Sequence, residues 1–188
     1  MPNHTLRAAV VLALIAAVAA PVAVAAPAPA EPPAPARTTH SSLAGEARMA
    51  YPVADEEVRV RVDAHARFGP ASLPTRSWGT FRISHEVDGT VHWGEFAVDC
   101  LTTGGPTATV TGRLVRTSPG HVWREVLDPD VRMGVSFHVP GKGGEARIGL
   151  SGATPKGEPQ LTRCMAPAAD ARVVEGGYRL KDRLPDTP

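Results

Sequence analysis

The chain of 188 residues has little of several residue types that mark particular classes of protein. Aromatic residues make up only 5% of it, and two cysteines are too few for an all-cysteine zinc site or a disulfide-dense scaffold. The net charge of +1 excludes the strong electrostatic signature of a nucleic-acid-binding protein, so we expect no nucleic-acid partner. Glycine (18 residues) and proline (19 residues) are instead abundant, which favours a turn-rich β protein over a helical bundle.

Residues 1–25 have the features of a secretory signal peptide. Arg7 supplies the positive charge, the apolar run 8–20 follows, and residues 23–25 (Ala-Val-Ala) form a cleavage site. The apolar run is shorter than the roughly 20 residues that span a bilayer, and no other stretch approaches that length. We therefore predict a secreted, extracellular protein with no membrane span after cleavage; an uncleaved anchor is the alternative.

An Ala/Pro-rich segment separates the predicted signal peptide from the folded part. Repeated prolines block helices and strand ladders, so we predict a disordered linker over 26–45. A single β domain over 46–182 and a frayed tail over 183–188 complete the chain.

The pattern of the folded part is typical of antiparallel β structure. Residues 58–68 alternate strictly, with apolar residues at the even positions, as in a strand with one buried face. Besides the hairpin described next, we expect strands over 107–116, 122–127, 131–139, 146–150, 161–164 and 172–180. Roughly eight strands with turns at short intervals predict an all-β fold, a single antiparallel β-sandwich or small β-barrel.

A hairpin is the clearest feature of the sequence. The alternating runs 78–87 and 90–102 flank Asp88-Gly89, which favours a two-residue type I′ turn because both central residues need a positive φ. This turn determines the register and places His85 opposite His92. The predicted core face carries Phe81, Ile83, Val87, Phe96, Val98 and Cys100.

Cys100 and Cys164 are the only cysteines. In an exported chain we expect them to pair, and the closed loop would stabilise the fold by about 4 kcal/mol on the chain-entropy model. A reactive thiol or a metal ligand is the alternative. The position of Cys100 on the predicted core face favours the structural disulfide.

The succession of these elements resembles a group of secreted proteins. Its parts are the run 89–94, the step 98–101 with its Cys-Leu pair, the glycine turn 104–105, the Thr/Val strand 108–112, Cys164 and the closing strand 173–178. This order resembles secreted, largely uncharacterised actinobacterial β-domain proteins, some of them labelled repetin-like. The resemblance covers residues 77–180; it implies secretion, one β domain and a Cys100–Cys164 pairing, and no activity.

The two opposed histidines of the hairpin are the sharpest local signal for chemistry. Directly opposed residues have Cβ atoms about 5 Å apart, so His85 and His92 could share a metal ion such as Zn²⁺ or Cu²⁺. A third ligand could come from His65, His121 or His138. The alternative, which we favour, is a protein without a cofactor whose histidines form local hydrogen bonds at the rim of the sheet.

The opposite face of the hairpin carries a second candidate site. Arg82 pairs there with Glu95 and Ser84 with Trp93, and Trp78 lies on the same face. An exposed tryptophan can serve as a platform for a sugar ring or a partner protein. We therefore predict a ligand-binding patch of Trp78, Arg82, Trp93 and Glu95; packing of Trp93 against a loop is the alternative.

Signals for catalysis are weak. The chain has no Gly-x-Ser-x-Gly elbow, and Gly141-Lys142 lacks the spacing of a phosphate-binding loop. The sequence therefore predicts a non-catalytic module that binds an extracellular or cell-wall ligand through exposed strand and loop residues. A metal-binding protein that uses the hairpin histidines is the alternative, and a secreted hydrolase or a structural wall protein is less favoured.

Overall fold

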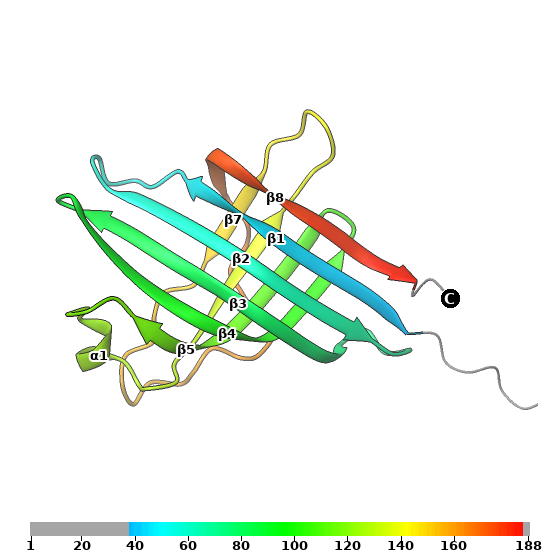
Figure 1. The fold of residues 1–188 in the computed structure, drawn as a ribbon, viewed down its shortest axis with the longest axis horizontal. Helices are drawn as coiled ribbons and strands as arrows, with labels where there is room; N and C mark the ends of the chain where they lie inside the picture. Colours follow the sequence, from blue (N-terminus) through cyan, green and yellow to red (C-terminus); the bar gives the residue numbers. More distant parts are fainter. Residues whose placement is uncertain (1–37, 186–188) are drawn as a thin grey trace, which may run out of the picture. The chain divides into compact units, whose positions relative to one another are not determined.

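Eight antiparallel strands follow one another around a closed barrel, each hydrogen-bonded to the next in sequence (Figure 1). The structure is a computed structural model that describes residues 38–185. Its strands are β1 (Thr39–Met49), β2 (Glu57–Phe68), β3 (Pro74–Val87), β4 (Thr90–Gly104), β5 (Thr107–Thr117), β6 (Arg132–His138), β7 (Arg147–Leu150) and β8 (Ala171–Pro185). One short helix, α1 (Trp123–Val126), lies between β5 and β6, and no helix of the described residues is long and apolar enough to cross a membrane.

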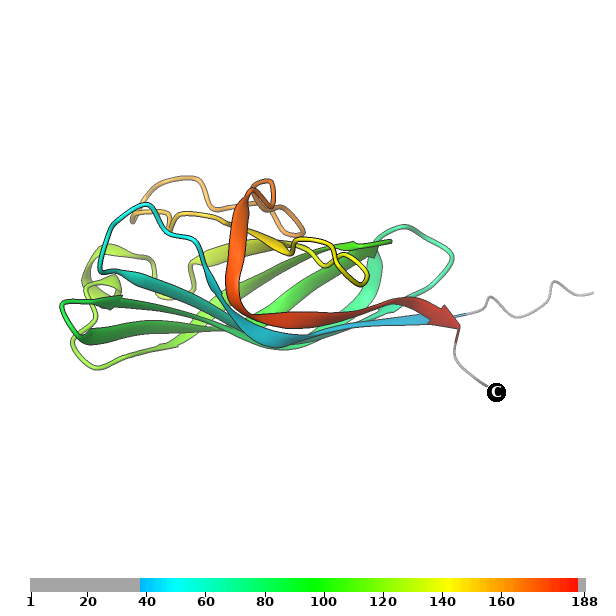
Figure 2. The same ribbon diagram turned by 90° about the horizontal axis from the view of Figure 1, so that it is seen from above.

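The prediction of an all-β fold is confirmed. Of the two predicted architectures, a sandwich and a barrel, the structure is the barrel. All strand pairs are antiparallel, and β8 closes the ring by pairing with both β1 and β7. Figure 2 shows how β8 achieves this: it bends part-way along, from β1 towards β7. Within β8, Gly176 has a φ of 79° and approaches the carbonyl group of Glu46 so closely that there is no room for a side chain.

The β domain begins earlier than predicted. The prediction of a disordered linker is wrong from residue 39 onward, because β1 already starts at Thr39 and pairs with β2 and β8. The sequence pattern did not reveal β1 because some of its buried positions are polar. Ser41 is fully buried, and its hydroxyl lies 2.9 Å from that of Thr103. At the other end β8 runs to Pro185, past the predicted boundary at 182. The predicted signal peptide and the first part of the linker lie outside the described residues.

Two predicted strands are also wrong. Residues 122–127 contain α1 and a single bridge from Leu127 to Pro155, so their apolar residues follow a helical turn and not a strand. Residues 161–164 belong to the irregular segment 151–170 between β7 and β8. The other predicted strands agree with the structure to within a few residues at their ends.

The interior of the barrel is filled by alternate side chains, as the sequence pattern predicts. The even-numbered apolar residues of β2 are all buried: Val58, Val60, Val62, Ala64, Ala66 and Phe68. In the β3–β4 hairpin Phe81 stacks on Phe96 with ring centroids 4.7 Å apart. The turn is confirmed as well, with φ values of 50° at Asp88 and 70° at Gly89.

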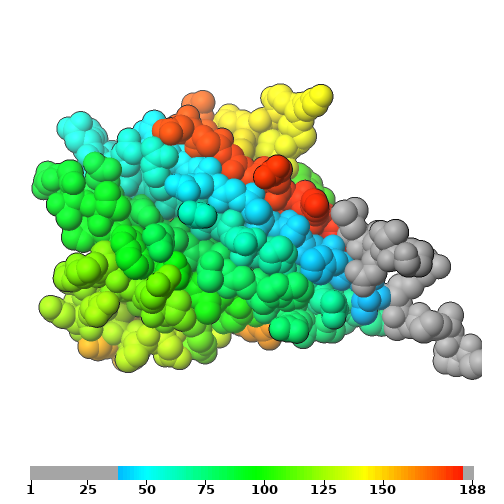
Figure 3. Space-filling view, viewed as in Figure 1, coloured from blue at the N-terminus to red at the C-terminus, as the bar shows by residue number. Residues whose placement is uncertain are grey.

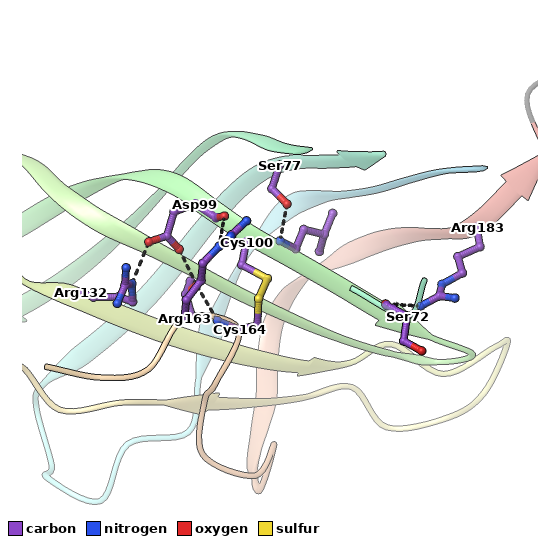
Figure 4. The surroundings of a disulfide bond; sticks show 10 residues. Ser72, Ser77, Asp99, Cys100, Arg132, Arg163, Cys164 and Arg183 are labelled. Atoms are coloured by element: carbon purple, nitrogen blue, oxygen red, sulfur yellow. Dashed lines mark hydrogen bonds and ion pairs between the residues drawn. A yellow bond between two sulfur atoms is a disulfide. The ribbon is translucent and has the colours of Figure 1, made fainter. Parts of the chain in front are cut away.

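Cys100 departs from the predicted core face, although it is buried and forms the expected disulfide with Cys164. The register of β4 against β5 shifts between Val98 and Cys100, and Leu101 enters the interior core in place of Cys100. The disulfide therefore attaches the segment 151–170 to the outer side of the barrel (Figure 4). Val87, at the hairpin tip, is only half-buried.

Asp99, the extra residue in this bulge, ties three elements together. Its carboxylate accepts hydrogen bonds from the hydroxyl of Thr111 (2.6 Å) and from Nε of Arg132 (2.7 Å). Its carbonyl oxygen accepts one from Nε of Arg163, the neighbour of Cys164 (2.9 Å; Figure 4). Charge-assisted bonds of this kind reinforce the disulfide and hold the segment against β4, β5 and β6.

Candidate ligand-binding cavity

The β3–β4 hairpin carries His85 and His92 to one end of the barrel. Side chains alternate along a strand, so His85 shares the inward face of Ile83, and His92 that of Phe96. The two histidines are Cα partners, as the predicted register requires. The hairpin thus directs both imidazoles towards the mouth of the barrel.

Three connections meet the hairpin at this end, opposite the end where β1 begins and β8 finishes (Figure 1). The β1–β2 connection supplies Tyr51, and the residues before and within α1 supply His121 and Trp123. The segment that follows β7 supplies Ser151. These residues come from distant parts of the chain and are brought together by the closure of the barrel.

A cavity of about 510 Å³ opens at this end. It is lined by Tyr51, Val58, Ile83, His85, His92, Gly120, His121, Val122, Trp123, Met133, Leu150, Ser151, Gly152 and Ala153. Most of this lining is apolar, and among the described residues no Asp, Glu, Lys or Arg contributes to it. Cavities of this size with an apolar body and a few polar groups are typical of small-molecule binding sites.

His121 is one of two buried polar residues of the cavity, with Ser151, each 8% exposed. Its Nδ1 accepts a hydrogen bond from the backbone N–H of Trp123 at 3.1 Å, which leaves the ring proton on Nε2 in the neutral imidazole. The ring also packs on Trp123 (4.6 Å between centroids) and meets His92 edge-on (5.4 Å). Burial, followed by the neighbouring His92 and His85, lowers the pKa of His121.

His85 has a different partner. Its Nε2 lies 2.6 Å from a carboxylate oxygen of Glu56, and its ring meets the edge of Tyr51 at 5.2 Å. The two hairpin histidines therefore turn to separate neighbours, His85 to Glu56 and His92 to His121. Among the described residues, no group of three or more His, Cys, Asp or Glu is arranged to hold a metal ion.

Only one of the three proposed third ligands is near the pair. His121 contacts His92, whereas His65 bonds to Asp63 on the outer face and His138 lies at the far end of β6. Metal binding by His85 and His92 stays a prediction, with His121 as the nearby one of the three proposed third ligands.

The predicted outer patch is brought together in part. Arg82 lies over the ring of Trp93 at 4.2 Å and forms an ion pair with Glu95 at 2.8 Å. Arg116 binds the other oxygen of Glu95 at 2.6 Å. Arg116 and then Arg82 lower the pKa of Glu95. Trp93 is therefore half-buried under Arg82 on the outer surface of the strands. Figure 3 shows this outer surface over the first strands of the barrel.

Trp78 belongs to a separate cluster on the same outer surface. Its ring stacks on His65 (5.5 Å) and lies near that of His40 (5.4 Å), and Arg76 caps it at 5.4 Å. His40 lies in β1, the strand that the sequence pattern did not reveal. The four predicted ligand-binding residues thus form two clusters, and neither lines the barrel cavity.

Sequence reasoning missed most of the cavity. Tyr51 and Trp123 line it from the connections between strands, where no periodicity indicates which way a side chain points. The sequence identified the pair of hairpin histidines because the turn determines their register. The cavity around them forms only when the barrel closes. Comparisons of the chain with protein-family models, with curated proteins and with solved structures find no match, so the resemblance to secreted actinobacterial β-domain proteins stays a prediction.

Proposed function

We propose that this chain is a secreted, non-catalytic binding protein that takes a small, mainly apolar molecule into the open end of its barrel. The observation that carries this proposal is the cavity of about 510 Å³, which is lined largely by apolar side chains. Ile83, Trp123 and Met133 offer it an apolar wall, and removal of such surface from water drives binding.

An extracellular location is supported by the Cys100–Cys164 disulfide, because such bonds persist in oxidising compartments. The signal-peptide features of residues 1–25 point in the same direction.

The cavity supports binding better than the outer patch does. On the outer surface Trp93 is covered by Arg82, which is itself paired with Glu95, so a ligand would have to displace an existing contact. At the barrel end, Trp123 already lines an open space.

The test is binding of N-phenyl-1-naphthylamine, a neutral apolar dye whose fluorescence rises in apolar sites, to the oxidised chain that begins at Ala26. We expect saturable binding that Ala153→Trp weakens at least about tenfold, because the added indole fills the cavity. Val174→Trp, on the exposed outer side of β8, is the matched control and should bind like the wild type. Wild-type affinity in Ala153→Trp, or no saturable binding by the wild type, would contradict the proposal.

A further inference from the structure

Three histidines line one side of the cavity, its histidine end. His85, His92 and His121 come from β3, β4 and the connection after β5, whereas Met133 and Leu150 line the cavity from β6 and β7. A ligand that fills this space would meet apolar side chains along its body and imidazoles at one end.

Several hydrogen-bond donors of the cavity have no acceptor among the described residues. The Nδ1 of His121 is already an acceptor for the N–H of Trp123, so its Nε2–H is the free group, and no described residue accepts from it. Ser151 likewise accepts from the N–H of Gly134 at 3.0 Å, which leaves its hydroxyl proton to donate. His92 forms no hydrogen bond with any described residue and can offer an N–H as well.

The acidic neighbour of this end, Glu56, is already paired with one of its histidines. Glu56 faces Nε2 of His85 at 2.6 Å and does not line the cavity. No other carboxylate lines it among residues 38–185, so no fixed negative charge on the cavity wall opposes an anion. Unused donors in apolar surroundings favour a ligand group with strong acceptor oxygens, and bonds to an ionised acceptor are about twice as strong as neutral ones.

We propose that the histidine end recognises a carboxylate, and that the ligand class is therefore an amphiphilic carboxylic acid. Its hydrocarbon part would lie between Ile83, Trp123 and Met133, and its carboxylate would accept hydrogen bonds from His121, Ser151 and His92. This inference rests on the proposed function, because it names the head group of a ligand bound in the same cavity.

The test compares three probes with the same chain of twelve carbons: dodecanoate, 1-dodecanol and dodecylamine, each below its micelle concentration. Each displaces N-phenyl-1-naphthylamine from the oxidised chain that begins at Ala26. We expect dodecanoate to bind roughly tenfold tighter than dodecanol and tighter still than the cationic amine. His92→Phe and His121→Phe keep a ring in the wall and remove the donor, so each should reduce the preference for dodecanoate over dodecanol. His65→Phe, on the outer surface, is the matched control and should keep that preference.

The outcomes separate the two proposals. If the wild type binds the dye and ranks the three amphiphiles equally, or if both cavity variants keep the wild-type preference, the carboxylate inference is overturned and the binding function stands. If the wild type binds neither dye nor amphiphile, both proposals are overturned. His92 has no hydrogen-bonded protein partner among the described residues, so His92→Phe leaves no buried polar group without a partner. We therefore expect this variant to fold and to test recognition alone.

Discussion

His121 shows how one buried side chain can make the stability of a barrel depend on pH. Burial comes first among the causes that lower its pKa below the ordinary value of 6.5, and the nearby His92 and His85 come next. The unfolded chain therefore binds the proton more readily than the folded one. The contribution of His121 to stability is present above about pH 6.5 and is lost as the pH falls towards its lower folded-state pKa.

We expect His121→Gln to reduce this pH dependence. Glutamine can still accept the N–H of Trp123 through its amide oxygen, and it does not titrate. The free energy of unfolding, measured with urea at several values between about pH 7.5 and about pH 5.5, should fall less in the variant than in the wild type. Ala153→Gln adds an amide at the same end, keeps the histidine and should follow the wild type. Equal slopes for His121→Gln and wild type would contradict this prediction.

Gly94 decides where the main aromatic wall of the cavity lies. A Cβ at this position of β4 would come within 2.5 Å of the Trp123 ring and 3.2 Å of Leu114. We expect Gly94→Ala to displace Trp123, to cost roughly 1–3 kcal/mol and to weaken dye binding in the cavity. Thermal unfolding and dye titration measure the two effects. Gly141→Ala is the matched control, because its Cβ would meet no atom within 4 Å, and a loss no larger than that of this control would refute the steric argument.

At the scale of elements, the disulfide and Asp99 attach the segment 151–170 to the barrel. The segment fits closely because Gly134 and Gly149 have no side chains where the backbone of Met165 and Ala168 passes over them. This attachment matters for the cavity as well, since Ser151 and its two successors line it at the beginning of the same segment.

Removal of both sulfurs, Cys100→Ala with Cys164→Ala, should destabilise the oxidised protein by about 4 kcal/mol on the chain-entropy model. The half-cystines are 64 residues apart, so their bond removes much freedom from the unfolded chain. Urea unfolding gives the free energy, and hydrogen exchange over 160–170 should become faster. Arg163→Ala keeps the disulfide and removes one hydrogen bond to Asp99, so we expect a loss of only about 1 kcal/mol. A double variant no less stable than Arg163→Ala would disprove the proposed role of the bond.

At the scale of the whole molecule, closure depends on β8. This strand pairs with β1 over most of its length and with β7 through only two residue pairs, Arg147–Arg172 and Ile148–Ala171. Closure pairs both edges of β1, with β2 on one side and β8 on the other, and open edges are sites of association between chains.

A chain that ends at residue 170 should therefore lose its cooperatively folded state. Without β8 the edge of β1 is unpaired, and the buried residues Leu43 and Ala47 lose the cover of Tyr178 and its neighbours. We expect aggregation or self-association in size-exclusion chromatography and the absence of a single sharp unfolding transition. A chain that ends at Pro185 is the control and should behave like the full chain. Monomeric, cooperative folding of the shorter chain would show that the barrel does not need β8.

Local patterns in the sequence determined much of this architecture. The alternation of 58–68 identifies the inward face of β2, because successive side chains of a strand point to opposite sides. The Asp88-Gly89 turn determines the pairing of His85 with His92, because a two-residue loop allows a single register. Both inferences depend on residues close together in the chain, where backbone geometry leaves few alternatives.

Only the tertiary structure decided the rest. The inward face of β1 includes Ser41, which is buried against Thr103 through a contact across 62 residues, so the local pattern could not reveal this strand. The shift at Asp99 turned Cys100 outward, and it depends on how β4 and β5 pair. The cavity itself joins His85 of β3 to Tyr51, His121 and Ser151, which come from three separate connections. Their side-chain directions follow from packing against the closed barrel and not from any periodicity.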